Sequence, residues 1–204
     1  MNAIIARFAA ISIFTLGLTA NAIATPITLT ATLTGPNESP PNSSLATGFA
    51  KVVYDGAAHT LGLNVSFSGL SGADTAAHIH CCTIAPFTGT AGVATAIPVF
   101  PGFPIPVTSG TYSHLFDLTQ ADFWNPSFVT AHGGTPQSAE AFFAPALLLG
   151  ETYLNIHTEN NTGGEIRGFL VETPEPATLA LVGAGLFVVG GLGMRRKRKG
   201  RVAK

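Results

Sequence analysis

The chain has 204 residues, of which 46% are hydrophobic and 10% are charged, and its formal net charge at pH 7 is −1. Seven of its ten cations lie in the last ten residues, and residues 25–172 hold only two cations, Lys51 and Arg167, against ten acids. Nucleic acid is therefore not an expected partner, because a protein that binds it must neutralise phosphates with cations.

The first 24 residues have the pattern of a secretory signal peptide. Arg7 precedes an apolar run over residues 8–18, and small residues follow. Ala22 and Ala24 fit the small-x-small rule for cleavage after Ala24, and cleavage after Ala22 is the alternative. Because the apolar run is too short to span a bilayer as a helix, we expect a cleaved signal and an exported protein.

Residues 25–172 are expected to form one domain, since about 150 residues are enough for a single substantial core. Segments rich in β-branched and aromatic residues are separated by turn signals, which predicts an all-β sandwich. The Asp55-Gly56 pair predicts a hairpin turn. Strands are expected over residues 27–33, 46–55, 56–70, 76–80, 110–118, 151–158 and 165–171.

One short helix and two loops complete the expected domain. The helix covers Pro136–Leu149 and ends at Gly150, and Pro145 is a residue that can kink it. Two stretches rich in proline, glycine and small polar residues, 35–44 and 85–110, are expected to be loops.

The string AHIHCC contains His78, His80 and both cysteines of the chain. Successive side chains of a strand point to opposite faces, so His78 and His80 share one face and Ile79 points to the other. The same alternation puts His157 opposite the apolar positions of its own strand. Because apolar side chains belong in the core, we expect these histidines outside it, on solvent-facing or loop-covered surface.

A His-x-His pair on one strand and a third histidine on another can supply three imidazoles to one ion, as zinc and copper prefer. His78, His80 and His157 are therefore the candidate metal ligands. The alternative is that they hydrogen-bond neighbouring strands and loop carbonyls and so fix one end of the sandwich. The remaining histidines are scattered and are expected at surface or turn positions: His59, His114 and His132.

Cys81 and Cys82 are adjacent, and an exported chain meets an oxidising environment in which thiols normally pair. Four alternatives stay open for them. They form a strained, easily reduced vicinal disulfide, join the histidines as thiolate ligands of copper or zinc, crosslink two chains, or are small buried residues at a strand end.

Glu165 and Arg167 stand two apart on the last expected strand and so share a face. We expect a structural role for both, in ion pairing that ties this strand to the sheet, and a binding role is the alternative. The sequence has no Gly-x-Ser-x-Gly elbow, His-Glu-x-x-His helix, phosphate loop or dinucleotide fingerprint. Hydrolase and nucleotide-binding functions are therefore not expected.

Two blocks of the sequence, AHIH at residues 77–80 and YLNIHTENNTGGEIRGFL at residues 153–170, resemble the signature blocks of the CHRD domain. The second block is the more specific, because it fits the family pattern N-x-H-T followed by G-E-I-R-G. The family commonly has Gly-Pro after AHIH, where this chain has Cys81-Cys82. The resemblance implies an immunoglobulin-like or superoxide-dismutase-like antiparallel sandwich without an established activity, so a function must be argued from its sites.

The C-terminal end has three parts in a fixed order. Pro174, Glu175 and Pro176 precede an uncharged span over residues 177–194, close to the length of a transmembrane helix. A basic cluster follows and is expected on the cytoplasmic side: Arg195, Arg196, Lys197, Arg198 and Lys199.

This arrangement resembles the PEP-CTERM sorting signal of Gram-negative bacteria. The resemblance implies recognition by an exosortase in the inner membrane and cleavage near Pro-Glu-Pro. It also implies export to the cell surface or the exopolysaccharide matrix, with the inner membrane as a transient partner.

The first functional hypothesis is an exported, non-catalytic structural or interaction module. It consists of a signal peptide (1–24), a CHRD-like domain (25–172) and a sorting signal (173–204), and its partners are the exosortase and then exopolysaccharide or surface proteins. The alternative is an extracytoplasmic copper- or zinc-binding protein, redox-active if the cysteines take part. A third hypothesis, polysaccharide binding, has only Phe123 and Trp124 as an aromatic platform.

Overall fold

The fold is known from a computed structural model, which describes residues 25–173. Within this range, no helix has the length and apolar character needed to cross a membrane. Several predictions lie outside the described residues: the signal peptide (1–24), the Pro-Glu-Pro motif (174–176), the transmembrane span (177–194) and the basic cluster (195–199).

The described chain is mostly β-structure, as predicted, with little helix. Its 3₁₀ helices are Gly35–Asn37 and Ala121–Phe123. The strands and α-helices follow in the order β1 (Ile27–Thr34), β2 (Thr47–Asp55), β3 (Thr60–Ser68), β4 (Asp74–His80), β5 (Gly110–Asp117), α1 (Pro126–Ala131), α2 (Pro136–Leu149), β6 (Tyr153–Thr158), β7 (Ile166–Phe169) and β8 (Val171–Glu172).

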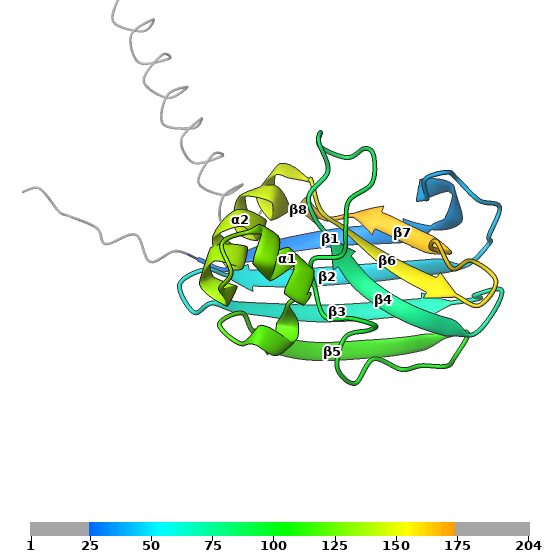
Figure 1. Cartoon of the computed structure of the whole chain (residues 1–204). Coiled ribbons are helices and arrows are strands. Elements are labelled where there is room, and N and C mark those ends of the chain that lie inside the picture. Colours follow the sequence, from blue (N-terminus) through cyan, green and yellow to red (C-terminus); the bar gives the residue numbers. More distant parts are fainter. Residues whose placement is uncertain (1–24, 174–204) are drawn as a thin grey trace, which may run out of the picture.

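All eight strands belong to one antiparallel sheet that curls into two layers. The order is β4-β6-β7-β1-β2-β3-β5, and β8 pairs with β1. Strands β7 and β1 are joined by a single residue pair, Thr34 with Arg167, and the sheet folds at this junction. Strands β4 and β6 consequently lie over β2 and β3 (Figure 1). The predicted sandwich class is confirmed in this curled form.

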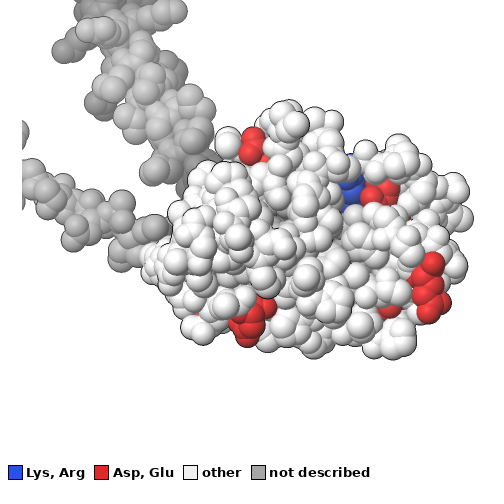
Figure 2. Space-filling view, viewed as in Figure 1, with Lys and Arg blue, Asp and Glu red and all other residues white. Residues whose placement is uncertain are grey.

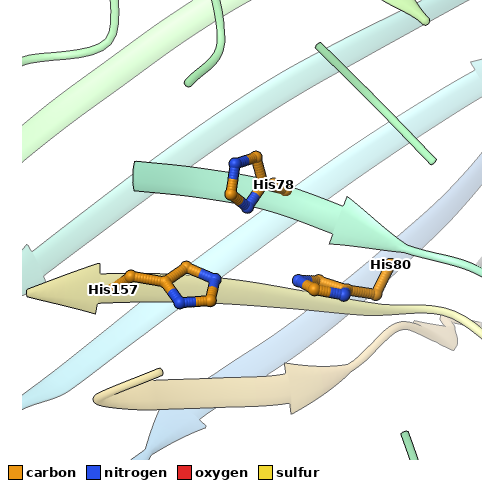
Figure 3. A group of neighbouring side chains, drawn as sticks. All are labelled: His78, His80 and His157. Carbon is orange, nitrogen blue, oxygen red and sulfur yellow. The ribbon is translucent and has the colours of Figure 1, made fainter. Parts of the chain in front are cut away.

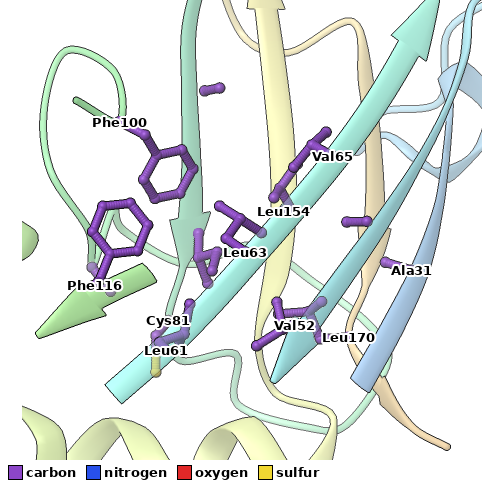
Figure 4. Packing of buried hydrophobic residues seen from close by; sticks show 14 of the residues in the cluster. Ala31, Val52, Leu61, Leu63, Val65, Cys81, Phe100, Phe116, Leu154 and Leu170 are labelled. Carbon is purple, nitrogen blue, oxygen red and sulfur yellow. The ribbon is translucent and has the colours of Figure 1, made fainter. Parts of the chain in front are cut away.

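The core fills the space between the two layers. Along β3, alternate residues are buried, and Leu61, Leu63 and Val65 belong to the same hydrophobic core as Leu154 of β6 (Figure 4). Fully burying a leucine side chain contributes about 1.5–3 kcal/mol. The strict alternation explains why the sequence pattern predicted these strands to within a few residues.

The two helices close one end of the sandwich (Figure 1). Helix α2 begins with a capping box between Thr135 and Ser138, and it ends at Gly150, which adopts the left-handed conformation that favours glycine. Helix α1 was not predicted, because its six residues carry no periodic signal. It is capped by the side chain of Asn125, which accepts a hydrogen bond from the Ser127 N–H.

Residues 81–109, here called the covering loop, connect β4 to β5. Phe100 and Phe103 anchor this loop in the hydrophobic core. Two isolated bridges join the loop to β4, one from Val93 to His80 and one from Val99 to Ala77. The covering loop therefore lies along β4, the strand that carries His78 and His80.

Candidate metal centre

His78, His80 and His157 meet on the face of the sheet that is turned away from the core. His78 and His80 alternate with the buried core residues of β4, and His157 belongs to the neighbouring strand β6. In the β4–β6 register, His157 pairs with Ala76, one position along the same face from His78. Figure 3 shows the three rings turned toward a common centre.

One nitrogen of each ring points into this three-histidine cluster, and these atoms lie within 4.8 Å of one another. Nitrogens that bind one zinc ion tetrahedrally at about 2.0–2.1 Å lie about 3.4 Å apart. The nitrogens therefore need to approach one another by up to about 1.4 Å to share an ion. Within residues 25–173, no other group of histidine, cysteine and acidic ligands has this geometry.

Backbone carbonyls hold the other nitrogen of each ring. His78 donates from Nε2 to the Pro98 carbonyl at 2.6 Å, and His80 donates from Nδ1 to the Ala91 carbonyl at 2.9 Å. His157 donates from Nδ1 to the Thr162 carbonyl at 3.0 Å. Since a carbonyl oxygen accepts, each contact fixes the proton on the outward nitrogen and leaves a lone pair on the inward one. Those inward nitrogens are buried and have no partner.

Burial keeps the three imidazoles neutral. His78 and His80 are 6% and 8% exposed. Burial, with a contribution from neighbouring His157, lowers the pKa of His78 to about 4. Burial also lowers the pKa of His80 to about 4 and that of His157 below its ordinary value. At neutral pH the lone pairs are therefore available to a cation without displacing a proton.

Tyr153 and Arg167 extend the site across the same face. The Tyr153 ring stacks on His80 with a centroid distance of 4.7 Å and an interplanar angle of 7°. The Arg167 guanidinium carbon lies 4.7 Å from the Tyr153 centroid. Beside it, Glu38 is also buried, and burial raises its pKa to about 7 although the charge of Arg167 acts to lower it.

Residues 29–170 match the model of the CHRD domain family, and this match covers well over half of the chain. The chain belongs to the CHRD domain family. Residues 172–198 match the PEP-CTERM protein-sorting motif, and that motif implies an exported protein that is sorted by an exosortase. No curated protein matches the chain.

The two cysteines of the CHRD domain are joined to each other by a disulfide. Cys81 is 5% exposed and packs in the hydrophobic core, on the face opposite the histidines. Neither sulfur belongs to the three-histidine cluster. Of the four alternatives for this pair, the geometry corresponds to the vicinal disulfide.

Glu165 of the CHRD domain is fully buried and accepts hydrogen bonds from three segments. Ser44 Oγ donates at 2.6 Å, Ser71 donates from its backbone N–H at 2.7 Å and from Oγ at 2.8 Å, and Thr158 Oγ1 donates at 2.6 Å. Burial acts to raise the pKa of Glu165, but these hydrogen bonds outweigh it and lower the pKa. The carboxylate therefore joins two loops to β6.

Arg167 has partners other than Glu165. Its Nε lies 3.8 Å from a Glu38 carboxylate oxygen and donates to the Asn37 carbonyl. Its Nη1 donates to the Gly89 carbonyl at 3.1 Å. The sequence places Arg167 and Glu165 on one face, but in the described chain each belongs to its own network.

The other candidate residues lie away from the cluster. His59 Nδ1 is 2.8 Å from a Glu140 carboxylate oxygen, His114 is exposed on β5, and His132 stacks on Phe142. The aromatic pair considered for the third hypothesis, polysaccharide binding, is buried and offers no exposed platform. Its members are only 1% and 2% exposed: Phe123 and Trp124.

The groups that orient the three imidazoles, the Tyr153 side chain and the backbone carbonyls, were not predicted from the sequence. Tyr153 could have been found, because it precedes His157 by four residues on a strand and so shares its face. The carbonyls of Ala91 and Pro98 could not, because every residue carries a carbonyl and the covering loop has no periodic pattern. Only the fold shows which carbonyls reach the imidazoles.

Proposed function

We propose that this exported protein binds one zinc or copper ion through His78, His80 and His157 of its CHRD domain. The observation that carries the proposal is the convergence of three buried imidazole nitrogens without a hydrogen-bond partner, at most 4.8 Å apart. Each opposite nitrogen is engaged by a backbone carbonyl. Metal-ligating histidines typically have this second contact, which sets the tautomer and the ring orientation.

A purely structural role explains the hydrogen bonds of the outward ring nitrogens but not the arrangement of the inward ones. Hydrogen bonding to strands and loops leaves the inward nitrogens of all three histidines buried and unpaired. Each unpaired buried polar group costs about 1–3 kcal/mol. A single cation at the common centre satisfies all three at once, which supports the metal hypothesis over simple hydrogen bonding.

The donor set favours zinc or copper over harder cations. Neutral imidazole suits zinc and copper, whereas magnesium and calcium prefer oxygen ligands. Three protein ligands leave a position on the ion for water or another small ligand. A bound ion there supplies Lewis acidity or, in the case of copper, one-electron chemistry.

We further infer that the metal-binding domain acts as a non-catalytic structural or interaction module at the cell surface or in the exopolysaccharide matrix. The PEP-CTERM match supports this location. In this role the ion adds stability outside the cell, because a cation that binds only the folded state stabilises it.

Metal analysis of protein recovered from the periplasm tests the proposal. We expect about one zinc or copper ion per chain in the wild type, and loss of most of it in His80→Ala and in His157→Ala. His114→Ala is the matched control, because it removes an exposed imidazole outside the cluster. Equal, sub-stoichiometric metal in all four proteins contradicts the proposal.

A further inference from the structure

We propose that Tyr153 is a positioning residue of the metal centre, which fixes the imidazole of His80 through both its ring and its hydroxyl. This inference rests on the proposed function and extends that function to a residue that is not itself a metal ligand.

His80 differs from the other two ligands in lying at the end of its strand. It is the last residue of β4, so the ladder of β4–β6 hydrogen bonds ends at its pair with Tyr153. Beyond it the chain turns into the covering loop. His78 and His157, in contrast, lie inside their strands. A ligand at a strand end keeps its orientation only if something other than the ladder holds it.

The Tyr153 ring provides the first contact. It lies nearly parallel to the His80 imidazole, with centroids 4.7 Å apart. Tyr153 is itself held, because the Arg167 guanidinium lies over its ring and Phe169 meets it edge to face at 5.4 Å. Figure 3 shows the His80 ring directed along β6 toward His157. The stacked ring therefore restricts rotation of the imidazole out of the site.

The Tyr153 hydroxyl provides the second contact, by way of Ala91. The Ala91 N–H donates to Tyr153 Oη at 3.2 Å, and the hydroxyl lies 3.3 Å from the Ala91 carbonyl oxygen. The same carbonyl accepts the Nδ1–H of His80 at 2.9 Å. The hydroxyl thus anchors the backbone group that puts the His80 proton on Nδ1 and leaves the Nε2 lone pair for the ion.

The two contacts are separated by the variants Tyr153→Phe, which keeps the ring and loses the hydroxyl, and Tyr153→Leu, which loses both. Tyr112→Phe is the matched control. The Tyr112 hydroxyl donates to the Pro101 carbonyl at 2.8 Å, so the control also removes a hydroxyl that holds the covering loop. Tyr112 stacks on none of the three ligands.

The experiment titrates the metal-free protein with Co²⁺, followed by visible absorption, and with Zn²⁺ in competition. We expect Tyr153→Phe to weaken binding about tenfold and Tyr153→Leu up to about a hundredfold, the range found for residues that orient metal ligands. The Co²⁺ spectrum at saturation should also shift in both variants, because the His80 nitrogen moves. A loss of fold stability alone does not shift that spectrum.

Wild-type affinity and an unchanged spectrum in Tyr153→Phe overturn the inference, as does an equal loss of affinity in Tyr112→Phe. If Tyr153→Leu does not fold, Tyr153→Phe decides the matter alone. Failure of the wild type to bind either ion contradicts the proposed function instead, so the two failures are distinguishable.

Discussion

At the scale of single residues, the three-histidine cluster consists of buried imidazoles that are neutral at pH 7. Two of its members have pKa values of about 4, compared with an ordinary value of 6.5. An unfolded chain therefore binds more protons than the folded one between these values. Stability linked to these residues is present above pH 6.5 and is lost as the pH falls toward 4.

Acid should destabilise the metal-free domain for this reason. Near pH 4, His78 and His80 each lower the free energy of unfolding by at most about 3 kcal/mol, because one unit of pKa shift corresponds to about 1.4 kcal/mol. Glu38 acts in the opposite direction, because its pKa is raised to about 7 in the folded state.

Urea unfolding of the metal-free domain at several values between pH 7 and pH 4.5 measures this effect. We expect the free energy of unfolding to decrease as the pH is lowered, because the destabilising effect of the two histidines is larger than the stabilising effect of Glu38. In Glu38→Gln, which lacks that opposing effect, the decrease should be steeper. Stability that stays constant or rises toward pH 4.5 contradicts the assigned burial of the imidazoles.

The cysteine pair is testable at the same scale. Because Cys81 and Cys82 are joined and exported proteins meet an oxidising environment, we expect protein from the periplasm to resist alkylation. Mass spectrometry after iodoacetamide treatment should show no added groups without reductant and two after reduction. Two added groups without reductant return the thiolate-ligand hypothesis to consideration.

At the scale of elements, Glu165 links parts of the chain that no strand pairing joins. Its buried carboxylate accepts hydrogen bonds from the loops at Ser44 and Ser71 and from Thr158 in β6. Removing a buried charged acceptor leaves several donors unsatisfied, and each costs about 1–3 kcal/mol. We expect Glu165→Ala to lower the free energy of unfolding by at least about 3 kcal/mol.

Chemical denaturation of this variant beside Glu159→Ala measures the effect. Glu159 is exposed, so its substitution should change stability by less than about 0.5 kcal/mol. Equal stability of the two variants contradicts a structural role for the Glu165 network.

Strand alternation was enough to predict most of the elements and the face on which His78, His80 and His157 lie. It works because the apolar positions of β3 and β6 belong to one core, so each polar position must point away from it. Helix α1 and the path of the covering loop follow from tertiary contacts, such as the packing of Phe100 in the core. These contacts leave no periodic pattern, so the carbonyl groups that complete the proposed metal site were not predicted.

At the scale of the whole molecule, the sorting motif implies an exported protein. Charged side chains are few and separated on the face in Figure 2. Arg167, one of the two cations of the domain, is only 4% exposed. Among residues 25–173, Lys51 is therefore the only exposed lysine or arginine.

The sorting motif predicts a defect in processing when it is removed. Replacing Pro174, Glu175 and Pro176 by alanine should leave a longer precursor in the inner membrane, because the motif recognised by the exosortase is lost. Immunoblots of cell fractions measure this, with His114→Ala as a control that should be processed normally. Unchanged size and location of the alanine variant contradict exosortase sorting.

The most direct test of the metal centre is anomalous diffraction from crystals of the zinc-loaded domain, recorded at the zinc absorption edge. We predict one peak at about 2.0–2.1 Å from His78 Nδ1, His80 Nε2 and His157 Nε2. A zinc-loaded crystal without a peak between these three nitrogens would contradict it.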